Sequence, residues 1–396
     1  MKRLAHALAL GFAMLFGADM AAAVEVRAAV LRVDYPALAP ISRFEARPDD
    51  LGFAGAALAT EDNATTGSFL GHGFETATRA VPPEEAGAAL EDLIAAGHAH
   101  IAIHARADDL LRLADAAGER ALIYNVGARD TRLRDADCRA NVLHVTPSAA
   151  MLADAVAQFA VWKRWPDWLL VHGSNPADLA LADDYRRAAA KFGAEIVEER
   201  LFEDTGGARR TDTGHVLVQR QLPVFMQGAG DHDVVVAADA SDVFAPYLPF
   251  HLWTPRPVLG SGGLRPASFH PAHEAWGATQ FQRRFEAQAG RYVREADYDT
   301  WLALRVLGEA VTRTGTAGIA EVRDYVLSDA FELAAFKGVP VTVRAWNGQL
   351  RQPVLLHDGR ITVSVSPQEG FLHQVSPLDT LGIDAPESAC TAFAEE

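Results

Sequence analysis

The order of β-rich and helix-like stretches constrains the fold of this chain most strongly. Between residues 26 and 124, short aliphatic runs alternate with amphipathic runs of helical spacing. Pro82 and Pro83 open one of the helical runs and Gly97 closes it. The same alternation returns between residues 149 and 237. A repeated β-α-β order predicts a parallel sheet covered by helices on both faces, and its recurrence predicts two such lobes.

The individual elements follow from periodicity. We expect strands at residues 26–33, 69–78, 101–103, 121–124, 168–171, 195–201 and 233–237. We expect helices at residues 51–63, 82–96, 108–117, 149–164, 179–192, 214–226, 279–289, 297–313 and 319–327. Residues 339–345 and 353–365 read as paired strands, with hairpin turns at Asn347-Gly348 and Asp358-Gly359.

The length of 396 residues suits two domains better than one. Because helix-rich sequence returns after the second half, the chain is expected to re-enter the first lobe. The predicted boundaries are 24–146 and 259–338 for lobe 1, 147–258 and 339–366 for lobe 2, and 367–396 for a C-terminal tail. The glycines of 260–263 lack dinucleotide-binding spacing and predict a turn where the chain changes lobe.

The N-terminus has the pattern of a secretory signal peptide. Lys2 and Arg3 precede an apolar run at 4–16, and the alanines of 21–23 provide a cleavage site. The run is too short for a comfortable membrane span, and a buried N-terminal helix is the alternative. Residues 1–23 are therefore expected to be removed, leaving a soluble secreted protein.

Charge and cysteine content restrict the partners. The net charge of −16 disfavours nucleic acid and anionic lipid, and it serves either solubility or attraction of a cationic ligand. Cys138 and Cys390 are too few for a metal cage. In an oxidising compartment they either form one disulfide that ties the tail to the body or remain free.

Several segments resemble a known family. The chain is similar to the type I periplasmic binding proteins of ABC transporters, the branched-chain amino-acid-binding group. The similarity is in the order and spacing of five segments, residues 55–63, 169–175, 190–193, 233–239 and 298–304. The resemblance implies an α/β fold of two Rossmann-like lobes with parallel sheets joined by a multi-strand hinge. It also implies a small-molecule ligand between the lobes and an ABC transporter permease in the inner membrane as partner.

A narrower resemblance rests on other segments. The chain is also similar to a subgroup associated with PQQ-dependent alcohol dehydrogenase systems, through residues 33–36, 59–67, 124–130, 259–264 and 276–278. This resemblance implies periplasmic components of such systems as partners. The loops at 104–108 and 125–129 lack the small hydroxyl residues expected in amino-acid binders of the family. An amino-acid ligand is therefore not expected from these loops.

In an open parallel sheet, ligands bind beyond the carboxyl ends of the strands. That rule selects ten candidate ligand-binding residues: Asp34, Tyr35, His104, Arg106, Asn125 and Arg129 in lobe 1, and His172, Ser174, Asn175 and Asp239 in lobe 2. Arg106 or Arg129 can hold a carboxylate through a bidentate pair. The alternative for each residue is a solvated loop position or a helix cap.

Histidine and tryptophan clusters have structural interpretations as well as functional ones. We interpret three histidine clusters as structural rather than as metal sites. They are the histidines at 98, 100 and 104, the pair His270 and His273, and the run Asp231-His232-Asp233. Trp162, Trp165 and Trp168 form either an aromatic platform or, by preference, a packed helix end. Trp253 and Trp276 are expected at the rim of the interlobe cleft.

No nucleophile elbow, zinc-protease or P-loop pattern occurs in the sequence. Together with the resemblance to type I periplasmic binding proteins, this absence predicts a periplasmic substrate-binding protein of an ABC transporter, without cofactor and without enzymatic activity. The alternative is a sensory or docking periplasmic protein of the same fold that does not deliver solute.

Overall fold

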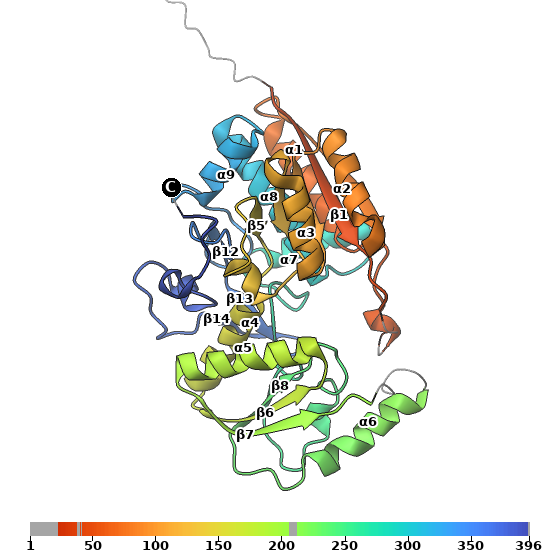
Figure 1. Ribbon diagram of the computed structural model, residues 1–396, viewed down its shortest axis with the longest axis vertical. Helices are drawn as coiled ribbons and strands as arrows, with labels where there is room; N and C mark the ends of the chain where they lie inside the picture. Colours follow the sequence, from red (N-terminus) through yellow and green to blue (C-terminus); the bar gives the residue numbers. More distant parts are fainter. Residues whose placement is uncertain (1–22, 38–39, 41, 206–211, 395–396) are drawn as a thin grey trace, which may run out of the picture.

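The computed structural model describes residues 23–37, 40, 42–205 and 212–394, so the predicted signal peptide lies outside the described residues apart from Ala23. Two α/β lobes lie one above the other in Figure 1, with the C-terminal segment along one side. No helix in this described part of the chain has the length and apolar character needed to cross a bilayer.

Lobe 1 is built on a parallel sheet that, among the described residues, has the strand order β2-β1-β3-β4-β5. Its strands are β1 (Glu25–Val33), β2 (Gly73–Val81), β3 (His100–His104), β4 (Leu122–Asn125) and β5 (Val142–His144). One face packs on α1 (Phe53–Gly67), α7 (Ala278–Ala289), α8 (Glu295–Thr314) and α9 (Ile319–Leu327). The other face packs on α2 (Ala86–Ala95) and α3 (Ala107–Ala117).

Lobe 2 has a second parallel sheet, in the order β7-β6-β8-β9. Its strands are β6 (Asp167–Gly173), β7 (Glu195–Phe202), β8 (Val234–Ala238) and β9 (Val258–Gly260). α4 (Ala149–Trp162) and α5 (Pro176–Phe192) cover one face, and α6 (Asp212–Phe225) covers the other. The predicted α/β architecture of two parallel-sheet lobes is thus confirmed.

Short antiparallel strands complete the described part of the fold. β10 (Arg265–Ala267) pairs with β13 (Val354–His357), which pairs with β14 (Thr362–Ser366). β11 (Thr342–Val343) pairs with β12 (Leu350–Arg351). The two predicted hairpin turns, at Asn347-Gly348 and Asp358-Gly359, are therefore confirmed. The segments 339–345 and 353–365 do not pair with each other, because each turn joins the two strands that flank it. β11 and β12 pack on the lobe 1 core, whereas β13 packs on the lobe 2 core.

Before its C-terminal segment, the described chain passes between the lobes at residues 145–148, 268–277 and 352–353. Buried side chains bind the backbone of these passages. Gln349 Nε2 donates to the carbonyl of Thr146 over 3.3 Å, and Gln352 Nε2 donates to the carbonyl of Val145 over 2.7 Å. Lys337 Nζ donates to the carbonyls of Ser268 and, over 2.9 Å, Pro353. A waist made of loops is thus kept free of unsatisfied carbonyl groups at these points.

Two further expectations can be compared with the structure. Trp168 is fully buried, and Trp162 and Trp165 contact the ring of Phe159, so the tryptophans at spacing three pack as preferred. Gly260 and Gly263 have φ angles of 98° and 63°, and a Cβ on Gly263 would lie 2.2 Å from the carbonyl oxygen of Val258. The turn at 260–263 is therefore tight, as predicted. It joins β9 to β10 within lobe 2 and precedes the passage at 268–277, so its predicted place at a change of lobe is wrong.

Phe281 tests the packing of the lobe 1 core. Its ring is 1% exposed and contacts Phe269, Trp301 and Phe336. We expect Phe281→Ala to lower the free energy of unfolding by about 3–5 kcal/mol in urea denaturation, because the surrounding rings cannot fill the cavity. Phe69→Ala, at a side chain that is 86% exposed, is the control and should change it by less than about 0.5 kcal/mol. Equal losses in both variants would contradict this account of the core.

Candidate functional site

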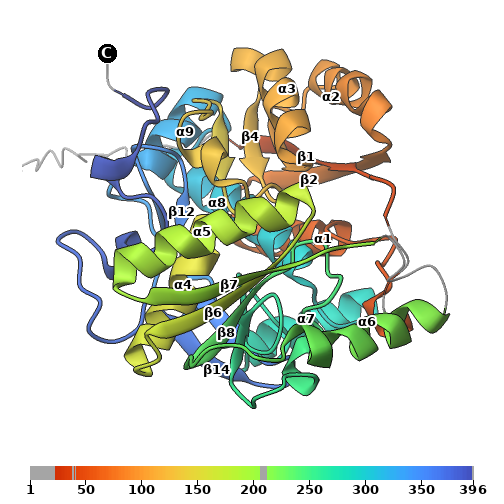
Figure 2. The same cartoon turned by 60° about the horizontal axis from the view of Figure 1, so that its bottom comes forward.

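The ten predicted residues lie in loops that follow strand ends or, for His104, Asn125 and His172, on the ends themselves. The segments that leave β1 and β7 emerge on the same side of the molecule, to the right in Figures 1 and 2. The C-terminal segment lies on the opposite side in both views. Groups at the carboxyl ends of both sheets are therefore gathered away from that segment.

Tyr35 and Arg106 form one unit in lobe 1. The Tyr35 hydroxyl accepts from the backbone N–H of Arg106 over 2.9 Å and donates to Asp109 Oδ2 over 2.6 Å. The Arg106 guanidinium lies over the Tyr35 ring, 4.2 Å from its centroid. Burial, together with the hydrogen bond to Asp109, raises the pKa of Tyr35 to about 12, so the hydroxyl stays protonated at neutral pH.

Asp34 and His104 belong to a neighbouring charged group. Burial alone would raise the pKa of Asp34, but hydrogen bonds from Arg32 and Arg47 hold it below its usual value. His104 Nε2 shares a 2.6 Å hydrogen bond with Thr300 Oγ1 of α8. Burial and the nearby charges of Arg32 and Arg47 lower the pKa of His104 to about 3, so the ring is neutral at pH 7.

Asn125 and Arg129 have partners within lobe 1. Asn125 is fully buried, and its Oδ1 accepts from the N–H groups of Gly127 and Ala128 while Nδ2 donates to the carbonyl of Ala128. Its amide thus holds the turn after β4. Arg129 pairs with Glu295 of α8 at 2.6 Å, with both side chains partly exposed.

In lobe 2, Ser174 and Asn175 start α5. Ser174 Oγ accepts from the N–H of Asp204 over 3.0 Å. Asn175 caps the helix in a capping box with Asp178, and Asp178 Oδ1 also accepts from the N–H of Ser241. Both predicted residues are half-buried rather than enclosed.

His172 and Asp239 face the protein more than the solvent. Both ring nitrogens of His172 meet acceptors, the Gly173 carbonyl at 2.9 Å and Glu199 Oε1 at 3.0 Å. The Asp239 carboxylate accepts from three N–H groups in the turn that follows it, those of Val243, Phe244 and Ala245. Burial raises the pKa of Asp239 to about 6 despite these bonds.

A charged cluster at the waist, in which Asp299 and Lys337 are buried and Glu295 is partly exposed, was not predicted. Glu295 Oε1 accepts from the N–H of Ser268 over 2.5 Å, and Lys337 is 2% exposed. Asp299, one turn after Glu295 on α8, is 1% exposed, and its Oδ1 has no hydrogen-bond partner among the described residues. The spacing of Glu295 and Asp299 on one helix was visible in the sequence, whereas nothing there linked them to Lys337.

Burial shifts the titration of this cluster. Burial and the charge of Glu295 raise the pKa of Asp299 to about 7. Burial lowers the pKa of Lys337 to about 7. The protonation state of the waist therefore changes close to neutral pH.

The histidine clusters and the two rim tryptophans have defined places. His100 contacts the carbonyl of Ala317, and His273 contacts the carbonyl of Phe336. Within the described ranges, no three His, Cys, Asp or Glu side chains converge to hold a metal ion. Trp253 and Trp276 are 59% and 53% exposed.

Comparisons with known proteins agree with this geometry. A family model described as periplasmic binding protein matches residues 51–221. A branched-chain amino-acid ABC transporter periplasmic ligand-binding protein from Burkholderia xenovorans has a TM-score of 0.70 at 16% identity, covering 93% of this chain and 100% of that one. None of the curated proteins compared with this sequence matches it.

Two further solved structures contain ligands. A solute-binding protein from R. palustris, in complex with benzoate, has a TM-score of 0.63 at 11% identity and covers 92% of this chain and 99% of that one. A branched-chain amino-acid binding protein from Streptococcus pneumoniae, in complex with isoleucine, has a TM-score of 0.62 at 12% identity and covers 86% and 98%. The fold of this chain is that of the type I periplasmic binding proteins.

Asp299 generates a pH prediction. Its folded pKa, about 7, lies above the ordinary value of 3.8, so the folded state holds a proton that the unfolded state has lost. The free energy of unfolding should therefore fall by up to about 1.4 kcal/mol for each unit by which the pH rises from about 4 to 6.5. Asp299→Asn should remove this contribution. The thermal unfolding temperature of the variant should therefore rise relative to that of the wild type as the pH increases. Asp329→Asn, at an exposed position, is the control, and its stability should change with pH as that of the wild type does. The same pH dependence for Asp299→Asn and the wild type would contradict the raised pKa of Asp299.

Proposed function

We propose that this protein is the periplasmic substrate-binding component of an ABC transporter. It binds a small organic molecule between its lobes, closes around it and presents it to an inner-membrane permease. The observation that carries the proposal is that two parallel sheets direct polar loop residues from their carboxyl ends to one side of the molecule. Lobe closure would exclude water from those groups. The role is binding rather than catalysis, as for the solute-binding proteins with the same fold.

We infer that the ligand carries a carboxylate, which Arg106 binds. Arg106 is exposed and lies over the Tyr35 ring, and it is near enough to Asp109 to help hold the pKa of that carboxyl below its usual value. Arg129, the other candidate, is already paired with Glu295. Ser174 and Asn175, half-buried in lobe 2, would supply hydrogen bonds when the lobes close. The solved structures with isoleucine and benzoate support a carboxylate because both molecules contain one.

A link to PQQ-dependent alcohol oxidation is a further part of the proposal. It rests on the resemblance of residues 33–36, 59–67 and 124–130 to the subgroup associated with those systems. Organic acids are products of alcohol oxidation, so a carboxylate ligand would fit that setting. Uptake of the bound acid by cells with and without the protein separates a transport role from a sensory or docking role.

The Arg106 assignment can be tested by calorimetry and thermal shift with branched-chain amino acids, benzoate and short aliphatic acids. We expect at least one acid to stabilise the protein. Arg106→Gln should weaken its binding about 10- to 100-fold, because a hydrogen bond to a charged partner is lost. Arg79→Gln, at an exposed residue of β2, is the matched control and should bind as wild type does. Unchanged affinity in Arg106→Gln would exclude Arg106 as the anchor, and no response to any acid would exclude the carboxylate ligand.

A further inference from the structure

The C-terminal segment, residues 367–394, contacts both lobes. It lies along the left of the molecule in Figure 1, away from the segments that leave β1 and β7. Its short helical turns are η6 (Pro377–Thr380) and η7 (Ala385–Glu387). The contacts fall into three groups: one on lobe 2, one on lobe 1, and one on the β11–β12 hairpin.

The lobe 2 contacts centre on Gly382. Its N–H donates to Asp154 Oδ2 of α4 over 2.7 Å, and its carbonyl accepts from Lys191 Nζ of α5 over 2.8 Å. The neighbouring Leu381 is fully buried in the lobe 2 core. Because Asp154 is itself buried and paired with Arg187, this anchor is fixed to the body of the lobe.

The lobe 1 contacts centre on Cys390. Cys390 forms a disulfide with Cys138, which confirms the tie between tail and body as the alternative to free thiols. The N–H of Ala389 donates to Asp135 Oδ1 over 2.5 Å. Phe393 lies under the Arg323 guanidinium, 5.4 Å from its ring centroid, so α9 also contacts the segment.

The third group is a buried ion pair. Asp379 accepts from Arg344 Nε over 2.9 Å and from Arg351 Nε over 2.8 Å, and the Arg344 and Asp379 side chains have 1% and 0% exposure. Arg344 also donates to the carbonyl of Leu381 over 2.6 Å. Since the hairpin packs on the lobe 1 core, this pair fixes the segment to lobe 1 three residues before its lobe 2 anchor.

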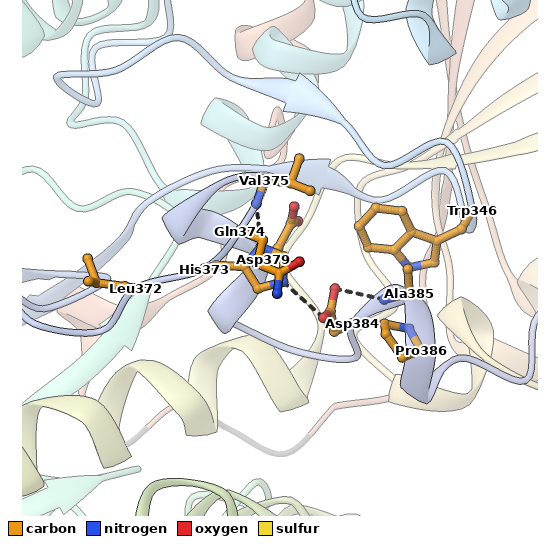
Figure 3. Close-up of a pocket in the computed structure, with 9 residues that line it drawn as sticks. All are labelled: Trp346, Leu372, His373, Gln374, Val375, Asp379, Asp384, Ala385 and Pro386. Carbon is orange, nitrogen blue, oxygen red and sulfur yellow. Dashed lines mark hydrogen bonds and ion pairs between the residues drawn. The ribbon is translucent and has the colours of Figure 1, made fainter.

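Packing distinguishes residues 376–390 from the loop before them. A cavity of about 630 Å³ separates the loop at 372–375 from Trp346 of the hairpin turn (Figure 3). Leu372 and Val375 in that loop are 86% and 78% exposed. The preceding loop contacts lobe 2 through Phe371, which packs on Phe192 of α5, and contacts the later residues through His373, which pairs with Asp384 over 3.0 Å. The contacts that reach both lobes lie within residues 376–390.

We propose that residues 376–390 are a strap that sets the range of angles between the two lobes. A rotation of the lobes that moves Gly382 on lobe 2 relative to Asp379 and Cys390 on lobe 1 must be accommodated by the few residues that join these anchors. The seven residues between Gly382 and Cys390 include η7, whose first turn is held by Asp384 and Glu387. On the other side, only two residues separate Gly382 on lobe 2 from Asp379, which is held by the lobe 1 hairpin. The strap thus restrains lobe motion from the side away from the strand ends. It requires no ligand and goes beyond the proposed transport function.

The test measures lobe motion without ligand. In Cys138→Ser/Cys390→Ser, we expect small-angle X-ray scattering to show a broader distribution of shapes. We also expect hydrogen exchange at residues 145–148 and 352–353 to rise at least about 10-fold, with circular dichroism unchanged. Leu372→Ser, in the loop outside the strap, is the control and should behave as wild type does. Faster exchange confined to 376–394, with unchanged scattering and unchanged exchange at the passages, would overturn the proposal.

A second route avoids the risk that the double variant misfolds. Reducing the single disulfide of the folded protein with a phosphine and capping both thiols releases the same anchor without substitution. Lys191→Gln removes the contact to the Gly382 carbonyl at the other anchor. Both treatments should broaden the distribution of shapes in scattering and raise hydrogen exchange at the passages, as in the double variant. If neither treatment changed the scattering or the exchange, the strap would be rejected.

Discussion

The waist between the lobes depends on satisfying backbone polar groups in loops that leave both sheets. Each passage lacks the ladder hydrogen bonds of a strand, so carbonyls such as those of Val145, Ser268 and Pro353 need other donors. Gln352 and Lys337 provide them from buried positions. A buried carbonyl without a donor would cost about 1–3 kcal/mol, so these side chains are a condition for two lobes to share one narrow waist.

The waist also holds several charged side chains in a region where burial gives them a large desolvation cost. Glu295, Asp299 and Lys337 are brought together by α8 and by the loop after α9, and Arg129 joins them from lobe 1. The attraction of Arg129 and Lys337 for the carboxylates offsets part of the desolvation cost. Burial, together with repulsion from Glu295, leaves the pKa of Asp299 at about 7, and burial leaves the pKa of Lys337 at about 7. The region that connects the lobes is therefore also the region most sensitive to pH near neutrality.

Much of the fold was predictable because its signal is local. The helix at 319–327 was predicted with the bounds that α9 has, since periodicity and flanking residues define it. β2 begins at Gly73 instead of residue 69, because residues after α1 form turns ending at Gly71, which has a positive φ. β5, β9 and β10 were missed because three residues are too few to show a period.

The candidate site was predictable in position but less so in role. Strand ends identified Tyr35 and Arg106, but their stacking needs the fold, since they are 71 residues apart. Asn125 and Asp239 follow the same rule, yet both bind N–H groups of their own turns. Sequence cannot distinguish an oxygen that faces its own backbone from one that faces a ligand. Ligand contact by the ten residues therefore stays a prediction.

The covalent bond of the strap also orders events while the chain is made. Cys138 precedes Cys390 by 252 residues, so its thiol emerges long before its partner exists. In an oxidising compartment a free thiolate exchanges with any accessible disulfide. Cys138 is only 6% exposed once lobe 1 has formed. Early folding of the first lobe would therefore shield this thiol from mispairing until the far end of the polypeptide arrives.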